Sequence, residues 1–482
     1  MRALLITGLL LVGCAHGPRP PQLDGWHELR STHFLLRTDL PSPDARTTLE
    51  QLETLRAALQ SVWSEADAAD APGITLAIVL RDRAELRSFT PWTGFATVIR
   101  RGPLIVASGP DVAFGDLSPH PELLAHEVAH GLDRRWMPGA PRWFDEGMAS
   151  YLESAELIDA GRVRLGGLSR DEVEQARAHT LMPLDTVAAA AWESASPSEL
   201  LEIYRSARLW VHLLRAEEPA RMRALEAALH RGVAWRTAWA DVRRGLDTAR
   251  LEDALRGWLY VGTLPTELRR FSPPRVQVEE RALPPWEVHL TLAELLGAVS
   301  GDVPSDRQRA ELEAAARAAP DEPLPRVLLA DLETDPDRRL ARAEALRKAY
   351  PGSPDAAVLL ARVLREDGGP VEGRREAMLD AVVLAPDDVD ALTAHALEEA
   401  RVGELARAFQ SLRQAEALAP WNPGVFVTRA VVLTRLGDCQ EALDAVQRAM
   451  DVLPDEAPGA ALAPLLKERT RIQGTCRPAH PP

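Results

Sequence analysis

Lysine is almost missing from this 482-residue chain. Lys348 and Lys467 are the only two, although lysine and arginine together number 56. Acidic residues outnumber these bases, and the formal net charge is −15. A protein that binds nucleic acid normally presents a basic face, so this charge argues against a nucleic-acid partner. Mutational bias in a GC-rich genome explains the preference for arginine more simply than an anion-binding role does.

Cysteine is also scarce. The chain has Cys14, Cys439 and Cys476, which do not form a disulfide framework or a cysteine-based zinc site. Cys439 and Cys476 could pair with each other in an oxidising compartment. In the alternative interpretation, Cys439 is a small core residue.

Only one strongly apolar run occurs, from Ala3 to Val12 behind Arg2, and it is too short to span a bilayer. A charged start, an apolar stretch and small residues at its end predict a secretion signal. The tetrapeptide Leu-Val-Gly-Cys, which ends at Cys14, resembles the lipobox of bacterial lipoproteins. An ordinary signal peptide with an incidental cysteine is the alternative.

The lipobox resemblance implies how the chain begins and where it resides. Residues 1–14 are the signal peptide and lipobox, and the thiol of Cys14 carries the lipid after cleavage. Residues 15–25 are rich in proline and glycine and form a tether. Acyl chains would then anchor the protein to the membrane. Because Ala15 rather than aspartate follows the cysteine, the resemblance implies a location in the cell envelope, on the periplasmic side of the outer membrane.

The strongest chemical signal is the segment His126-Glu127-Val128-Ala129-His130. Apolar residues at helical spacing around it predict a helix over 119–135. Two histidines four residues apart lie on one face of a helix and can converge on one metal ion. Glu127 is one step round the helix, where it can take a proton from water without binding the metal. A helix with two surface histidines is the alternative.

A second helix, predicted over 142–157, supplies a third ligand. It follows a proline-rich turn, and its sequence Trp-Phe-Asp-Glu-Gly-Met-Ala contains the carboxylate of Glu146. Two histidines and one glutamate leave the fourth position of a tetrahedral zinc ion open for water, which is typical of a catalytic site. The small residues Gly147 and Ala149 would let the two helices approach closely.

Together, the two segments resemble the gluzincin metallopeptidases, the group that contains thermolysin and the membrane alanyl aminopeptidases. The second zinc helix of that family carries a near-identical Trp–Glu–Gly–Ala pattern. The resemblance extends in layout over the domain that we assign to residues 26–263. It implies a single Zn²⁺ as cofactor, with Glu127 as the catalytic base. The implied metal ligands are His126, His130 and Glu146.

The sequence departs from the named enzymes in two ways. The connection from His130 to Glu146 is shorter, and no acidic motif before the zinc helix could bind a free amino terminus. These departures favour an endopeptidase, or an unknown amide hydrolase, over an aminopeptidase. By the same resemblance, the substrate lies against an edge strand beside the zinc helix. Leu104–Ala107 is the first candidate for this strand, and the strand around Phe95 is the second.

Gluzincins often use a tyrosine or histidine on a later helix to stabilise the oxyanion. Here the helix predicted over 198–216 carries Tyr204, the first candidate for this catalytic role, and His212, the second. Asp145 precedes the third ligand and could orient His130 by accepting a hydrogen bond. The alternatives are a packing role for Tyr204 and a solvated carboxylate at the start of a helix for Asp145.

The second half of the chain repeats with a period of 34 residues. Proline keeps this spacing at Pro386, Pro420 and Pro454, and glycine keeps it at Gly369, Gly403 and Gly437. A glycine at a helix–helix turn and a proline that closes the second helix resemble the tetratricopeptide repeat. Generic helical hairpins with coincident spacing are the alternative.

These observations predict an α+β chain. A small mixed β-sheet and a helical zincin-like metallopeptidase domain occupy residues 26–263. An all-α tetratricopeptide-repeat solenoid occupies residues 305–470. Between them, residues 264–304 are rich in proline and charge and predict a linker or helical connector. Residues 471–482 form a tail.

Three functions compete. The first is a membrane-anchored zinc metallopeptidase that hydrolyses peptide bonds in the envelope, with a protein substrate or partner bound by the repeats. The second is a non-catalytic repeat scaffold whose zinc domain is structural or vestigial. The intact Glu127 argues against the scaffold, because a structural site has no use for a base. The third is a peptidoglycan amidase, which the envelope location allows but no cell-wall-binding motif supports.

Overall fold

The computed structural model describes most of the chain. The described residues are 23–63, 74–90, 95–99, 102–108, 121–137, 139–190, 195–300, 305–367, 373–452 and 459–475. The predicted signal peptide, the lipidation site Cys14 and most of the tether lie outside these ranges, as does Cys476. Within them, none of the helices combines the length and the apolar character needed to cross a bilayer.

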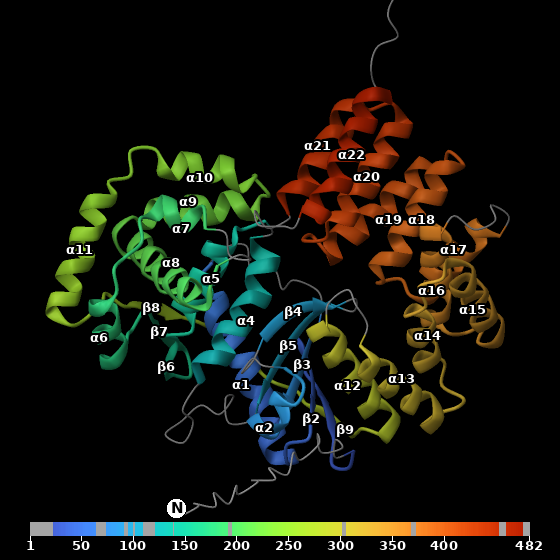
Figure 1. The fold of residues 1–482 in the computed structure, drawn as a ribbon, viewed down its shortest axis with the longest axis horizontal. Coiled ribbons are helices and arrows are strands. Elements are labelled where there is room, and N and C mark those ends of the chain that lie inside the picture. The colour runs from blue at the N-terminus through green and yellow to red at the C-terminus, as the bar shows by residue number, and fades with distance from the viewer. Residues whose placement is uncertain are drawn as a thin grey trace, which may run out of the picture.

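A mixed six-stranded sheet forms the centre of the first half, with the strand order β4-β5-β3-β2-β1-β9 (Figure 1). Strands β2, β3 and β5 run parallel to one another, whereas β1, β4 and β9 pair antiparallel with their neighbours. The strands are β1 (His27–Arg30), β2 (Phe34–Thr38), β3 (Thr75–Leu80), β4 (Phe95–Ile99), β5 (Gly102–Ser108) and β9 (Glu279–Ala282).

The strand order corrects one prediction. Leu104–Ala107, the first candidate for the substrate-binding edge, belongs to β5, which is hydrogen-bonded to β3 on one side and β4 on the other. Both sides of its backbone are therefore used within the sheet. Among the described strands, β4 is the edge on this side. The second candidate, the strand around Phe95, thus lies at this edge of the described sheet.

Both faces of the sheet are buried at its centre, in β3 and β5, as expected for parallel strands. Successive residues of β3 point to opposite faces, so Ala77 and Val79 join one core while Ile78 and Leu80 join another. Helices α1 (Ser42–Gln60) and α4 (Pro121–Trp136) cover the first face. Helices α2 (Arg83–Arg87) and α12 (Pro285–Ser300) cover the second.

The described part of the predicted connector, residues 264–300, is folded onto the first half of the chain. Its strand β8 (Glu267–Arg270) pairs with β7 (Arg162–Leu165), and β9 pairs with β1. Helix α12 then buries Val288 and Leu292 against the sheet. The prolines that suggested a boundary lie between these elements and at the start of α12.

A helical lobe with a small antiparallel sheet, β6-β7-β8, completes the first half (Figure 1). The helix predicted over 142–157 ends at Leu152, and β6 follows it. The elements are α5 (Arg142–Leu152), β6 (Glu156–Asp159), β7 (Arg162–Leu165), α6 (Arg170–Ala178), α7 (Leu184–Ala188), α8 (Pro197–Glu217), α9 (Pro219–His230), α10 (Trp235–Arg243) and α11 (Thr248–Val261).

The second half is an array of helical hairpins, as the period predicts. Equivalent small residues, Ala396 with Ala430 and Ala408 with Ala442, are all fully buried. Gly437 closes α20 in the left-handed conformation, which glycine adopts at little cost. The helices are α13 (Asp306–Ala318), α14 (Pro323–Asp331), α15 (Pro336–Ala349), α16 (Pro354–Asp367), α17 (Arg374–Leu384), α18 (Val389–Arg401), α19 (Leu405–Leu418), α20 (Pro423–Leu436), α21 (Cys439–Asp451) and α22 (Gly459–Thr475).

The array begins beside the sheet and curves back towards the helical lobe, so its two ends meet different parts of the first half (Figure 1). Cys439, the first residue of α21, takes part in a disulfide. Its partner lies outside the described residues, so the predicted pairing with Cys476 remains a prediction.

Candidate metal centre

Three side chains from two helices converge at one point. The Nε2 atoms of His126 and His130 lie 3.1 Å apart. Each of them lies 3.5 Å from Oε2 of Glu146. A tetrahedral zinc ion with ligand distances of about 2.0–2.1 Å separates its ligand atoms by about 3.3–3.4 Å. The three atoms therefore have the mutual spacing that one tetrahedral ion requires, and in both type and position they fit zinc.

The helices place these side chains for local reasons. His126 and His130 stand one turn apart on α4, whose opposite face packs into the core through Leu124 and Val128. Helix α5 begins after Pro141 and presents Glu146 in its second turn. Gly147 has a role different from the predicted one: a methyl group there would lie 2.7 Å from Cγ2 of Val211 and 2.8 Å from the carbonyl oxygen of Ala207. It therefore allows α8, rather than α4, to approach α5.

Each imidazole ring is held from behind by a carboxylate. The Nδ1 atom of His130 lies 3.1 Å from Asp145, the acceptor that the sequence predicted. The Nδ1 atom of His126 lies 3.0 Å from Glu153, which sequence reasoning missed. Such contacts keep the proton on Nδ1 and leave Nε2 free to bind a metal. Glu153 could have been found from its spacing, because it caps the C-terminus of α5 seven residues, or two helical turns, after Glu146.

The charges within the cluster reinforce one another. Burial disfavours the charged form of His126, but hydrogen bonds to Glu146 and Glu153 outweigh it and raise the pKa of His126 to about 9. Burial alone would raise the pKa of Glu146, yet the two imidazoles hold it far below its usual value. This carboxylate thus stays ionised, and a cation at the same point would replace the protons on the two Nε2 atoms.

Glu127, the predicted base, lies beside the ligands and is only 5% exposed. Its negative charge contributes to the raised pKa of His126. Asp133, one turn after His130, is buried further inside. Burial, followed by the charge of Asp145, raises the pKa of Asp133 well above its usual value. Sequence reasoning missed this buried carboxyl group.

Tyr204 reaches the cluster from α8. Its hydroxyl donates a hydrogen bond to Oε1 of Glu146, at 3.3 Å. Arg142 brings its Nε to 3.6 Å from the same oxygen. Arg142 was missed, although its position four residues before Glu146 places it on the same face of α5. His212, the second candidate for stabilising the oxyanion, is engaged elsewhere: it donates a hydrogen bond to the carbonyl oxygen of Pro265.

Comparisons with known proteins find likenesses among solved structures. No family model and no curated protein matches the chain. Among solved structures, a thermophilic TPR (tetratricopeptide-repeat) protein of Thermus thermophilus is similar at 21% identity and a TM-score of 0.29, over 39% of this chain and 98% of that one. Yeast Tom70 is similar at 13% identity and a TM-score of 0.30, over 76% of this chain and 67% of that one. The assignment of tetratricopeptide-like repeats rests on the hairpins and their period.

Proposed function

We propose that the protein is a zinc-dependent peptidase of the bacterial cell envelope that cleaves within peptide chains. The mutual spacing of the two Nε2 atoms and Oε2 of Glu146, 3.1, 3.5 and 3.5 Å, carries the proposal, because it matches a tetrahedral ion. The carboxylates behind both rings and the acid next to His126 add the parts that a catalytic site needs beyond its ligands.

A zinc ion bound here would supply a Lewis acid for the scissile carbonyl and lower the pKa of the attacking water. Glu127 takes a proton from that water and passes it to the departing amine. Tyr204 turns its hydroxyl from Glu146 towards the carbonyl oxygen as negative charge develops there. Arg142 adds positive charge at the same side of Glu146.

The other parts of the proposal concern location and partners. The lipid at Cys14 would anchor the protein to the membrane, and the repeats would bind a protein substrate or partner, as helical solenoids do with their extended surfaces. The absence of a motif for a free amino terminus supports cleavage within a chain.

The test compares the parent and Glu127→Gln, both without the signal segment, for zinc content and for cleavage of a mixed peptide library. We expect about one zinc in each, and cleavage by the parent alone, because the substitution keeps the shape of the side chain but removes the base. A parent that binds no zinc would contradict the proposal.

The second candidate is a repeat scaffold without catalysis. The hairpin array favours it, since the array takes up much of the chain, and the Thermus neighbour is itself described as a TPR protein. In this case both proteins of the test would carry zinc and neither would cleave any peptide.

A further inference from the structure

The last repeat of the array touches the connection between the two metal-binding helices. Gly139 lies in that connection, after α4 with His130 and before α5 with Glu146. A methyl group on Gly139 would overlap the carbonyl oxygen of Asp451, the last residue of α21. Two backbones therefore meet here without room for a side chain.

A second contact lies next to the first. The guanidinium group of Arg448, also on α21, donates a hydrogen bond to the carbonyl oxygen of Gly232, in the turn between α9 and α10. A methyl group on Gly232 would overlap this guanidinium. The ring of Phe426 packs against the same group, 5.5 Å from its Cζ to the ring centroid, and fixes its direction.

The turn that Arg448 contacts is itself joined to the zinc helix. His230, just before the turn, donates a hydrogen bond from Nδ1 to the carbonyl oxygen of Trp136, at 3.0 Å. The two rings also stack, with centroids 4.9 Å apart. Trp136 is the last residue of α4. Helix α21 thus contacts the connection that follows α4 directly. Through the turn at Gly232 and His230, it is also joined to the end of α4.

The array is also fixed at its beginning. Arg307 of α13 donates a hydrogen bond to the carbonyl oxygen of Ser88, at 2.7 Å, and its Cζ lies 4.4 Å from the centroid of the Phe89 ring. Because both ends are fixed to the first half, the array cannot straighten without breaking one attachment. We call the contacts of Arg448 and Asp451 with Gly232 and Gly139 the clamp.

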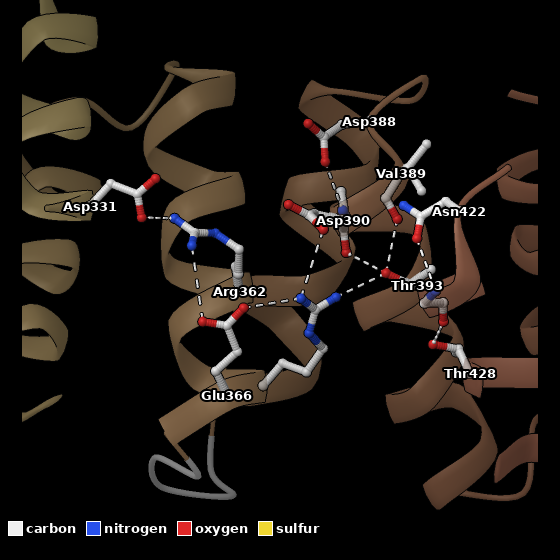
Figure 2. A network of polar contacts seen from close by, with 12 residues as sticks. Asp331, Arg362, Glu366, Asp388, Val389, Asp390, Thr393, Asn422 and Thr428 are labelled. Atoms are coloured by element: carbon white, nitrogen blue, oxygen red, sulfur yellow. Dashed lines mark hydrogen bonds and ion pairs between the residues drawn. The ribbon is translucent and has the colours of Figure 1, made fainter. Parts of the chain in front are cut away.

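Polar bonds join successive repeats between the two ends (Figure 2). Arg362 of α16 pairs with Asp331 of α14. Arg365 of α16 donates to Oγ1 of Thr393 on α18, at 2.9 Å. Three neighbouring repeats are linked in this way, in addition to their apolar contacts, so displacement at one end is passed along the array.

We propose that the clamp holds the connection between α4 and α5 in the shape that brings His130 and Glu146 together, so that the last repeat sets the affinity for the metal. The inference rests on the proposed metal centre. It makes Arg448 a positioning residue for that centre, from a helix more than 300 positions later in the chain. By linkage, metal binding also tightens the clamp.

The experiment measures zinc affinity by competition with a chelator in the lipid-free chain, for the parent and Arg448→Ala. We expect the affinity to fall at least about tenfold, as it does when groups that orient metal ligands are lost. Arg429→Ala is the control, because Arg429 pairs with Glu416 within the array and takes no part in the clamp. Its affinity should equal that of the parent.

Two glycine substitutions separate the clamp from general destabilisation. Gly232→Ala forces Arg448 away, whereas Gly245→Ala has a similar backbone cost, with φ of +66° against +78°, but meets nothing within 4 Å. We expect only Gly232→Ala to weaken zinc binding. In the Arg448→Ala background, Gly232→Ala should cause little further loss, because the two substitutions remove the same contact.

The outcomes distinguish this inference from the proposed function. A parent that binds zinc, with clamp variants that bind it within twofold of the parent, would overturn the clamp alone. A parent without zinc would overturn the proposed function. In that event the rate of amide hydrogen exchange at Gly139 and Ala140 still decides whether the clamp holds the connection: it should rise in Arg448→Ala, and an unchanged rate would refute the clamp as well.

Discussion

Two carboxylates, one expected and one not, contact the histidine rings of the candidate metal centre. We predict that Glu153→Gln lowers zinc affinity by about 10- to 100-fold, because the amide can no longer fix the proton on Nδ1 of His126 as a carboxylate does. Chelator competition measures this. Glu156→Gln is the matched control, since Glu156 of β6 is exposed and pairs with Arg164 of β7. Equal losses in both variants would refute the role of Glu153.

The catalytic role proposed for Tyr204 depends on its hydroxyl group, whereas a packing role does not. We predict that Tyr204→Phe reduces the rate of peptide cleavage by about 10²- to 10³-fold, the usual effect of removing one donor to an oxyanion. Zinc content should not change, because the phenyl ring still fills the space. Tyr260→Phe should leave the rate unaltered, since Tyr260 is 88% exposed. Full activity in Tyr204→Phe would leave this residue with a packing role only.

His212 makes stability depend on pH. Burial lowers its pKa from 6.5 to about 4, so the unfolded chain binds a proton at a higher pH than the folded chain does. Stability is therefore complete above about pH 6.5 and falls as the pH drops towards 4. Between pH 6.5 and 5 the loss from this group is about 2 kcal/mol. His212→Gln should flatten the free energy of unfolding over this range in urea titrations, and an unchanged slope would contradict the assignment.

At the scale of elements, the contact between α5 and α8 depends on Gly147. We predict that Gly147→Ala destabilises the protein by about 1–3 kcal/mol, the usual cost of an overpacked core, because the new methyl group meets Val211 and the backbone of Ala207. Gly131→Ala is the control: this helical glycine has nothing within 4 Å, and alanine there should stabilise α4 by up to about 1 kcal/mol. Urea titration of the metal-free proteins tests both, and the prediction fails if the two variants are equally stable.

Elements with their own local signals were predicted well, and those without were not. Helix α8 starts at its capping box, with Ser196 and Glu199 bonded to each other, and its bounds differ little from the predicted ones. By contrast, β8 and β9 have the sequences Glu-Leu-Arg-Arg and Glu-Glu-Arg-Ala, which carry no apolar alternation. They form strands because each pairs with another strand, and the residues of that partner strand lie elsewhere in the chain.

The same distinction between local and non-local sequence signals applies to the candidate metal centre. His126, Glu127 and His130 follow from spacing on one helix, and the order of residues on α5 identifies Glu146. Glu153 and Arg142 lie at helical spacing from Glu146, so sequence reasoning could have identified both. The burial of Asp133 and the clamp could not be identified from the sequence, because each depends on packing between segments with no shared sequence pattern.

At the scale of the whole molecule, the array is fixed to the first half at both ends, so its amide hydrogen exchange should change when the metal binds. A ligand that binds only the folded state at 100 times its dissociation constant stabilises that state by about 2.7 kcal/mol. If the clamp transmits this free energy, zinc should slow amide hydrogen exchange not only in α4 and α5 but also in α20 and α21. We predict this protection in the parent and its loss from α20 and α21 in Arg448→Ala.

A variant that lacks the Arg307 contacts at the start of the array provides the comparison. Arg307→Ala frees the start of the array from Ser88 and Phe89 but leaves the clamp intact. Zinc should therefore still protect α21 in this variant, while α13 exchanges faster with or without metal. If zinc protects α21 in none of the proteins, the last repeat does not respond to the metal, and its contact with the α4–α5 connection joins two parts of the fold without coupling them.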